Sequence, residues 1–131
     1  MSDAERAQKL RELLEEARSL NITIHFDDEA QAYLDWRARR HGASPENYRA
    51  ATLGDDIFVR PRYADNIRIL REELIHVQQG REGSINSVSV VEMEIQAREL
   101  MIQFRDRWGI MDSDVQEMMR EIEQMRQTGR Y

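Results

Sequence analysis

The chain has 131 residues, a formal net charge of −6 and no cysteine. This length fits a single domain, 1–131, with one hydrophobic core. The lack of cysteine excludes disulfides, thiolate zinc sites and cysteine nucleophiles, and the acidic balance disfavours nucleic acid as a partner. No apolar run is long enough to cross a membrane and the first residues do not resemble a signal peptide, so we expect a cytoplasmic protein without a membrane partner.

The first predicted helix covers residues 3–20. Ser2 and Glu5 have the spacing of a capping box, and the apolar residues that follow recur at helical spacing. The alternating segment 21–26 then predicts a half-buried strand. Its inner face is expected to carry Ile22, Ile24 and Phe26.

A second helix is predicted over 28–40, with Asp27 as its N-terminal cap. Its inner side is expected to carry Ala30, Tyr33, Leu34 and Trp36. Two short strands follow, over 48–53 and 56–61, and a Gly-Asp pair between them is typical of a turn.

Three more helices complete the predicted fold: 64–79, which stops at Gly80, 89–108 and 113–127. A loop over 81–87 separates the first two. The last helix carries one apolar stripe, formed by Val115, Met118, Met119, Ile122 and Met125, which is typical of a core or partner contact. The sequence therefore predicts an α+β protein, mostly helical, with a small sheet of two or three strands.

The segment 71–79 carries the clearest chemical signal. Glu72 and His76 lie one helical turn apart, with Glu73 beside them, on a different face from the apolar residues. Side chains four residues apart can reach one metal ion, which is the geometry that HExxH motifs use. Glu73 would then polarise a metal-bound water. The same pattern also fits a solvated helix face, and this alternative stays open.

The two remaining histidines carry weaker signals. His25 lies on a strand face and is typical of a hydrogen-bonded or exposed histidine rather than a ligand. His41 follows two arginines at the end of a helix, where a surface position near the helix dipole is expected.

Glu94 is the second informative residue. It falls within the apolar face of helix 89–108, whereas Glu92 and Glu99 fall on the opposite side. That face is expected to consist of Val90, Ala97, Met101 and Phe104, flanked by Met93 and Leu100. A carboxylate that points into a core needs a partner. A metal ion and an arginine both fit, and the sequence leaves the choice open.

A strand that ends in proline, a helix that reads E-x-x-H-V-x-Q and a later helix with an inward glutamate resemble the minimal core of zincin metallopeptidases. The resemblance covers about residues 55–104. It is strongest to small bacterial domains whose helix reads H-E-L-x-H-V-x-Q-Q and which occur in secreted effector and polymorphic toxin proteins. The resemblance implies that Glu72, His76 and Glu94 bind a divalent metal, with Glu92 as a weaker candidate for the last ligand, and that Glu73 is the catalytic base.

The sequence departs from this family at the first ligand, because Glu72 stands where the family has histidine. One imidazole with two carboxylates is a more anionic site, which holds zinc less selectively and tolerates manganese or iron better. The resemblance still predicts zinc as the first choice, a peptidase-type hydrolase and a protein or peptide substrate. It also implies a cognate inhibitor protein and secretion as an effector without a conventional signal peptide.

Three alternatives stand beside this prediction. A toxin domain could act on a phosphorylated or nucleotide substrate, which Arg60, Arg62 and Arg71 would bind; of these, Arg71 is the substrate-binding candidate. A non-catalytic module would instead dock partners through the helices 3–20 and 113–127. A di-iron carboxylate site needs a second Glu-x-x-His element, which this chain does not contain.

Overall fold

The computed structural model describes residues 1–83 and 88–131. Its helices are α1 (Asp3–Ser19), α2 (Asp28–Arg40), α3 (Ile67–Arg81), α5 (Val90–Gln103), α6 (Arg105–Trp108) and α7 (Asp112–Thr128). Its strands are β1 (Thr23–His25), β2 (Ala50–Leu53) and β3 (Asp56–Val59), and short 3-10 turns cover Pro45–Asn47 and Pro61–Tyr63. The predicted α+β class is confirmed. Within the described part of the chain, no helix is both long and apolar enough to cross a membrane.

Side chains cap the N-termini of four helices. The capping box of Ser2 and Glu5 is present at α1, and the Asp27 carboxylate accepts a hydrogen bond from the backbone N–H of Ala30, three positions further on, at α2. Asn66 and Ser89 accept the equivalent bonds at α3 and α5. These caps involve residues three positions apart, so most of the helix starts could be predicted from the sequence.

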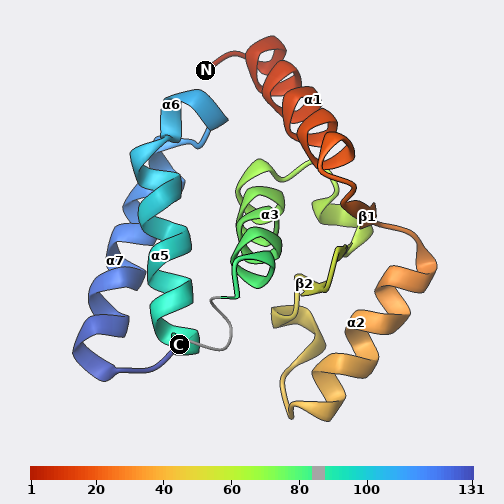
Figure 1. Ribbon diagram of the computed structural model, residues 1–131, viewed down its shortest axis with the longest axis vertical. Helices are drawn as coiled ribbons and strands as arrows, with labels where there is room; N and C mark the ends of the chain where they lie inside the picture. Colours follow the sequence, from red (N-terminus) through yellow and green to blue (C-terminus); the bar gives the residue numbers. More distant parts are fainter. Residues whose placement is uncertain (84–87) are drawn as a thin grey trace.

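The sheet has the strand order β1-β3-β2. β2 and β3 form an antiparallel hairpin, and β1 pairs with β3 in parallel. Because side chains alternate along a strand, Ile57 and Val59 join the core that includes α3. Phe58 points the other way and packs against Tyr33 of α2, with 4.3 Å between the ring centroids. The sheet therefore separates α2 from α3 (Figure 1).

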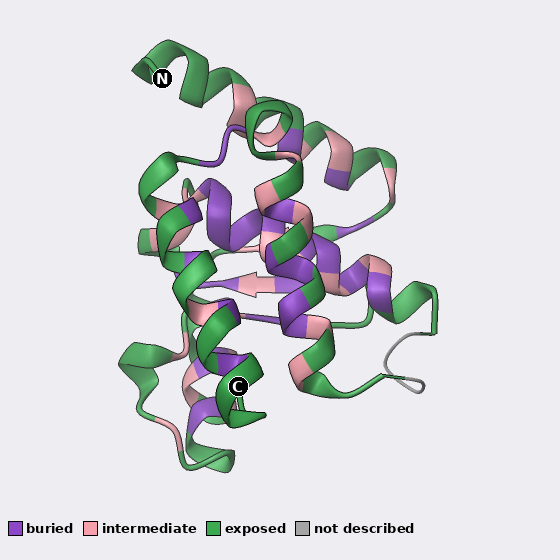
Figure 2. Cartoon of the chain, turned by 90° about the vertical axis from the view of Figure 1, so that its left-hand side faces the viewer, coloured by how far each residue is buried: buried purple, intermediate pink, exposed green. Residues whose placement is uncertain are grey.

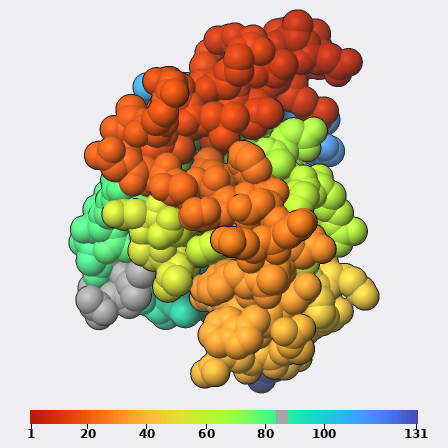
Figure 3. Space-filling view, turned by 90° about the vertical axis from the view of Figure 1, so that its right-hand side faces the viewer, coloured from red at the N-terminus to blue at the C-terminus, as the bar shows by residue number. Residues whose placement is uncertain are grey.

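Helix α3 lies at the centre of the molecule (Figure 1). It contacts the sheet on one side and α5 on the other, α1 also packs on it, and α7 packs on α5. Leu70, Leu74 and Val77 are buried in this central position, and Figure 2 shows the buried residues concentrated there. Figure 3 shows the face of the molecule that α1 and, below it, α2 cover. Polar residues of α3 must therefore find partners on neighbouring elements.

Two aromatic residues of the N-terminal half are not where the sequence predicted them. Phe26 is exposed, because the strand ends at His25 and the chain then turns into the capped start of α2. Trp36 is 48% exposed and carries the guanidinium of Arg40 5.0 Å from its ring centroid. The inner stripe of α2 instead consists of Ala30, Leu34 and Ala38, at four-residue spacing.

The helix bounds differ from the prediction in two places. Helix α3 starts later, after a 3-10 turn and the Asn66 cap, and it continues through Gly80 to Arg81. The predicted helix 89–108 is interrupted at Phe104, where the backbone leaves helical geometry, and α6 then ends at Gly109 with a left-handed φ of 72°. Of the predicted loop 81–87, residues 84–87 lie outside the described part of the chain.

Two predicted members of apolar faces are exposed as well. Val90, in the first turn of α5, is 58% exposed, and Met119 of α7, which borders an open groove between α5 and α7, is 52% exposed. The other four residues of the predicted α7 stripe are buried, as expected.

We expect Leu74→Ala to lower the free energy of unfolding by about 2–5 kcal/mol, because it leaves a cavity in the packed core. Leu74 is 1% exposed, whereas Leu53, at the end of the β2 strand, is 55% exposed. Leu53→Ala is the matched control and should change stability by about 0.5 kcal/mol or less. Urea denaturation followed by circular dichroism compares the two, and equal losses would contradict the position of α3 in the core.

Candidate metal centre

Three of the predicted site residues come together where α3 packs on α5. Glu72 and His76 belong to α3 and Glu94 to α5, and one ligand atom of each lies within 4.8 Å of those of the other two. This group could hold a metal ion, as predicted. Glu92, the weaker candidate, is exposed and does not belong to it.

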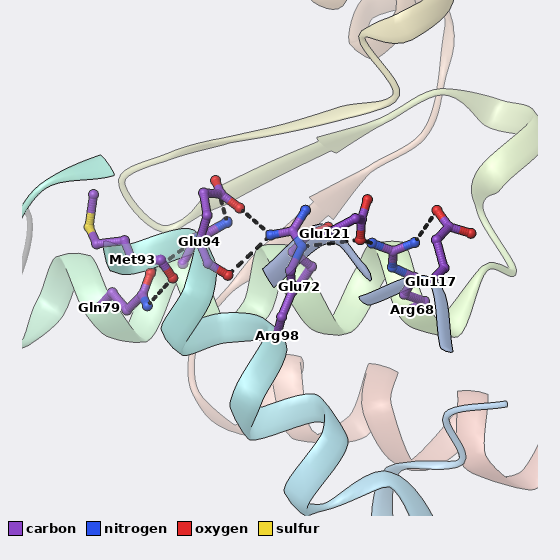
Figure 4. Close-up of polar contacts among 9 residues, drawn as sticks. Arg68, Glu72, Gln79, Met93, Glu94, Arg98, Glu117 and Glu121 are labelled. Carbon is purple, nitrogen blue, oxygen red and sulfur yellow. Dashed lines mark hydrogen bonds and ion pairs between the residues drawn. The ribbon is translucent and has the colours of Figure 1, made fainter. Parts of the chain in front are cut away.

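A glutamine fixes the orientation of the imidazole. Nδ1 of His76 lies 2.8 Å from Oε1 of Gln79. The amide nitrogen of Gln79 donates to the carbonyl of Met93 (Figure 4) and to Oε1 of Gln96. Because that nitrogen is the donor, Oε1 must be an acceptor, so a neutral His76 carries its proton on Nδ1. The lone pair then resides on Nε2, which lies 3.3 Å from Oε1 of Glu94.

Arg98 is the second partner of Glu94. Its Nη1 donates to Oε2 of Glu94 at 2.8 Å and lies 3.1 Å from Oε1 of Glu72 (Figure 4). The side chain of Arg98 is only 4% exposed. The sequence left open whether a metal ion or an arginine would be the partner of Glu94. In the structure, Glu94 pairs with Arg98 and also contacts His76.

One buried oxygen of this group lacks a hydrogen bond. Oε1 of Glu72 accepts none from the described residues, although the charge of Arg98 is close by. A buried acceptor without a hydrogen bond is costly, and the charge of Arg98, 3.1 Å away, offsets part of this cost.

The ion pairs continue from Arg98 to α7 and back to α3. Nε of Arg98 lies 3.2 Å from Oε1 of Glu121, and the same oxygen accepts from Nη2 of Arg68 at 2.7 Å. Nη1 of Arg68 in turn pairs with Glu117 at 2.9 Å. Figure 4 shows this row of alternating charges. Three helices are therefore joined by charges that include two members of the candidate metal centre.

Glu73 points to the sheet. Its Oε2 accepts a hydrogen bond of 2.5 Å from the hydroxyl of Thr52 on β2. Burial raises the pKa of Glu73 to about 7, although the charge of His76 and the Thr52 hydrogen bond act in the opposite direction. A carboxylate with this pKa can accept and return a proton near neutral pH.

The other three groups influence one another. Burial lowers the pKa of His76, but the hydrogen bond and charge of Glu94 outweigh this effect and raise it to about 9. Burial would raise the pKa of Glu94, yet His76 and Arg98 hold it below its usual value. For Glu72, burial dominates and raises the pKa against the attraction of Arg98. Near pH 7, the metal-free centre thus contains a protonated imidazole paired with an ionised Glu94.

The structure does not bring the predicted phosphate-binding arginines to this centre. Arg71 pairs with Glu16 of α1 at 2.8 Å, and its guanidinium lies 4.4 Å from the ring centroid of Trp108. Arg60 pairs with Asp35 and donates to backbone carbonyls, and the guanidinium of Arg62 lies 5.1 Å from the ring centroid of Tyr63. Arg71 therefore faces α1 and α6, because it lies on another side of α3 from His76.

The other two histidines are placed as the sequence predicted, His25 hydrogen-bonded and His41 at the surface. His25 pairs with Asp56 at 2.8 Å and stacks on Phe58. His41 is exposed at the end of α2.

Sequence reasoning missed three residues of the centre. Arg98 lies four positions after Glu94 on the same helix, a spacing typical of ion pairs that could have identified it. Gln79 lies three positions after His76, but its role depends on the Met93 carbonyl of another helix. The contact of Thr52 with Glu73 joins a strand to a helix, and no local pattern indicates it.

Comparisons with protein-family models, with curated proteins and with solved structures found no match for this chain. The function proposed below therefore rests on the geometry of the candidate metal centre.

We expect the metal-free protein to lose stability between about pH 7.5 and pH 9.5. The pKa of His76 is raised in the folded state to about 9, above its ordinary value of about 6.5. Its contribution is therefore complete below about pH 6.5 and is lost as the pH rises through 9. The loss in this window should be about 2 kcal/mol, at about 1.4 kcal/mol per pKa unit.

Urea denaturation in the presence of a chelator measures this dependence. His76→Gln should remove most of the loss, whereas His41→Gln, at an exposed position, should retain it. The pH range from about 7.5 to 9.5 lies above the pKa of Glu73, which is about 7. An equal loss in both variants would show that another group is responsible.

Proposed function

We propose that this chain is a metal-dependent hydrolase of the zincin type, of the peptidase class, in which Glu72, His76 and Glu94 hold the ion. The orientation of the imidazole carries this proposal. Histidines that bind metals donate their second ring N–H to a fixed acceptor, and Gln79 is such an acceptor for His76. The remaining nitrogen then faces two carboxylates from α3 and α5.

The residues present fit a divalent cation. The set offers one nitrogen and two carboxylates, and one of these carboxylates has a buried oxygen without a hydrogen bond from the described residues. Zinc is the first candidate because it accepts nitrogen and carboxylate ligands with open positions, and manganese or iron would also suit the anionic set. A bound ion would polarise a substrate carbonyl and make water a nucleophile at neutral pH.

Glu73 is the proposed general base. Its pKa of about 7 suits proton transfer near neutrality, and the Thr52 hydroxyl holds its carboxylate in place. Thr52 belongs to β2, a strand at the edge of the sheet. An extended peptide can pair with such an edge, which would bring it beside Glu73 and supports a peptide substrate. A role as an effector or toxin domain with a cognate inhibitor protein rests on the sequence resemblance.

The ion pair of Arg98 with Glu94 favours a second candidate, a non-catalytic protein-binding module on the same scaffold. Arg98 already supplies positive charge to both candidate carboxylate ligands. In that case the buried charges would hold α3, α5 and α7 together, and no metal would be needed.

We expect the full chain, purified without chelator, to bind about one divalent ion per molecule. His76→Ala should weaken zinc binding by at least about tenfold, because it removes the only nitrogen ligand of the set. Glu92→Gln is the matched control on α5, where Glu92 is exposed, and should bind as the wild type does. Isothermal titration with zinc and with manganese measures the affinities. If the wild type binds neither metal, the second candidate replaces the hydrolase.

We expect Glu73→Gln to keep metal binding and to lower peptide hydrolysis by about 10²–10⁴-fold, the usual contribution of a general base. Cleavage of unfolded casein by the metal-loaded chain is the assay. Glu92→Gln again serves as the control and should retain the activity. Wild-type cleavage that persists unchanged in Glu73→Gln would contradict the assigned role.

A further inference from the structure

We propose that Arg98 is an internal cation that occupies the ligand carboxylates of the metal centre, so that a divalent ion must displace it and Arg98 sets the affinity of the site. This inference rests on the proposed metal site and adds a residue that determines its affinity and selectivity.

The contacts of one nitrogen carry the inference. Nη1 of Arg98 reaches Oε2 of Glu94 at 2.8 Å and lies 3.1 Å from Oε1 of Glu72. These are the two carboxylates of the candidate metal centre. The same nitrogen also donates to the backbone carbonyl of Glu94 at 3.1 Å. The guanidinium is thus held beside the two carboxylates, and a metal ion would need the negative charge of these same carboxylates.

Charge explains why the arginine and the ion compete. Two ionised carboxylates balance one divalent ion, but with Arg98 in place the buried group would carry an excess positive charge. Like charges at short range in a poorly solvated interior repel strongly. The ion must therefore take the carboxylates from Arg98, and the free energy needed for this step lowers the affinity of the site.

Glu121 gives the displaced arginine another partner. Its Oε1 lies 3.2 Å from Nε of Arg98 and is not a member of the metal centre. Arg98 can keep this contact while Nη1 releases Glu72 and Glu94. Glu121 should therefore favour the metal-bound state, since it provides the remaining counter-charge. Glu117 offers a matched comparison on the same helix, because its ion pair is with Arg68.

The test measures zinc and manganese affinity of the full chain by competition with a chromophoric chelator, together with thermal unfolding with and without metal. We expect Arg98→Gln to bind metal at least tenfold more tightly than the wild type and to unfold at a lower temperature without metal. Glu121→Gln should bind at least threefold more weakly, and Glu117→Gln should bind as the wild type does.

The outcomes separate the two proposals. If the wild type binds metal and Arg98→Gln binds it equally or more weakly, Arg98 supports the site instead of competing for it, and the inference is overturned while the metal site stands. If Arg98→Gln binds and the wild type does not, the competition is supported and the metal-dependent hydrolase is contradicted. If neither binds, both fail.

The test also gives a result if Arg98→Gln does not fold in the absence of metal. Arg98→Gln that folds only when zinc or manganese is added supports the inference, because the ion then supplies the missing charge. If it does not fold at all, Arg98→Lys retains the charge but cannot reproduce the planar fork of the guanidinium. We expect Arg98→Lys to bind metal about threefold more tightly than the wild type, and unchanged or weaker binding overturns the inference.

Discussion

The contact between α3 and α5 buries acidic side chains at the centre of a small protein, and this constraint shapes most of what surrounds it. Glu72 and Glu94 face one another across the two helices. Carboxylates in such a position need counter-charges or hydrogen bonds. His76 and Arg98 supply the charges, and Thr52 supplies a hydrogen bond to neighbouring Glu73. The polar centre is thus built from helices and sheet together.

The same constraint connects the centre to α7. Arg98 and Arg68 share Glu121, so charges from three helices meet at one carboxylate. The apolar stripe of α7 packs beside them, and its Met118 and Val115 join the main core. A change of charge at Glu72 or Glu94 would therefore act on the docking of α7 as well as on the site. This connection gives a metal-dependent hydrolase and a partner-binding module a common structural basis, because both would use the same row of charges.

Features that depend on residues close together in the chain could be predicted from the sequence. The caps at Ser2, Asp27 and Ser89 lie three positions from the groups they bind, and Glu94 could be recognised by its place in an apolar helix face. Features that depend on contacts between distant segments of the chain could not be predicted from the sequence. Trp36 was expected on the inner side of α2, yet Ala30, Leu34 and Ala38 form the inner stripe. Whether the partner of Glu94 is an arginine, a metal ion or both depends on how α3, α5 and α7 pack, and no local spacing in the sequence indicates this packing.

The central claim is that an imidazole nitrogen and two carboxylates form one metal site. X-ray absorption spectroscopy of the full chain loaded with one equivalent of zinc tests it most directly. The account predicts one imidazole ligand at about 2.0–2.1 Å and carboxylate oxygens at about 2.0–2.2 Å, with the imidazole signal lost in His76→Ala. A zinc shell of oxygens alone, or an imidazole signal that persists in His76→Ala, would contradict it.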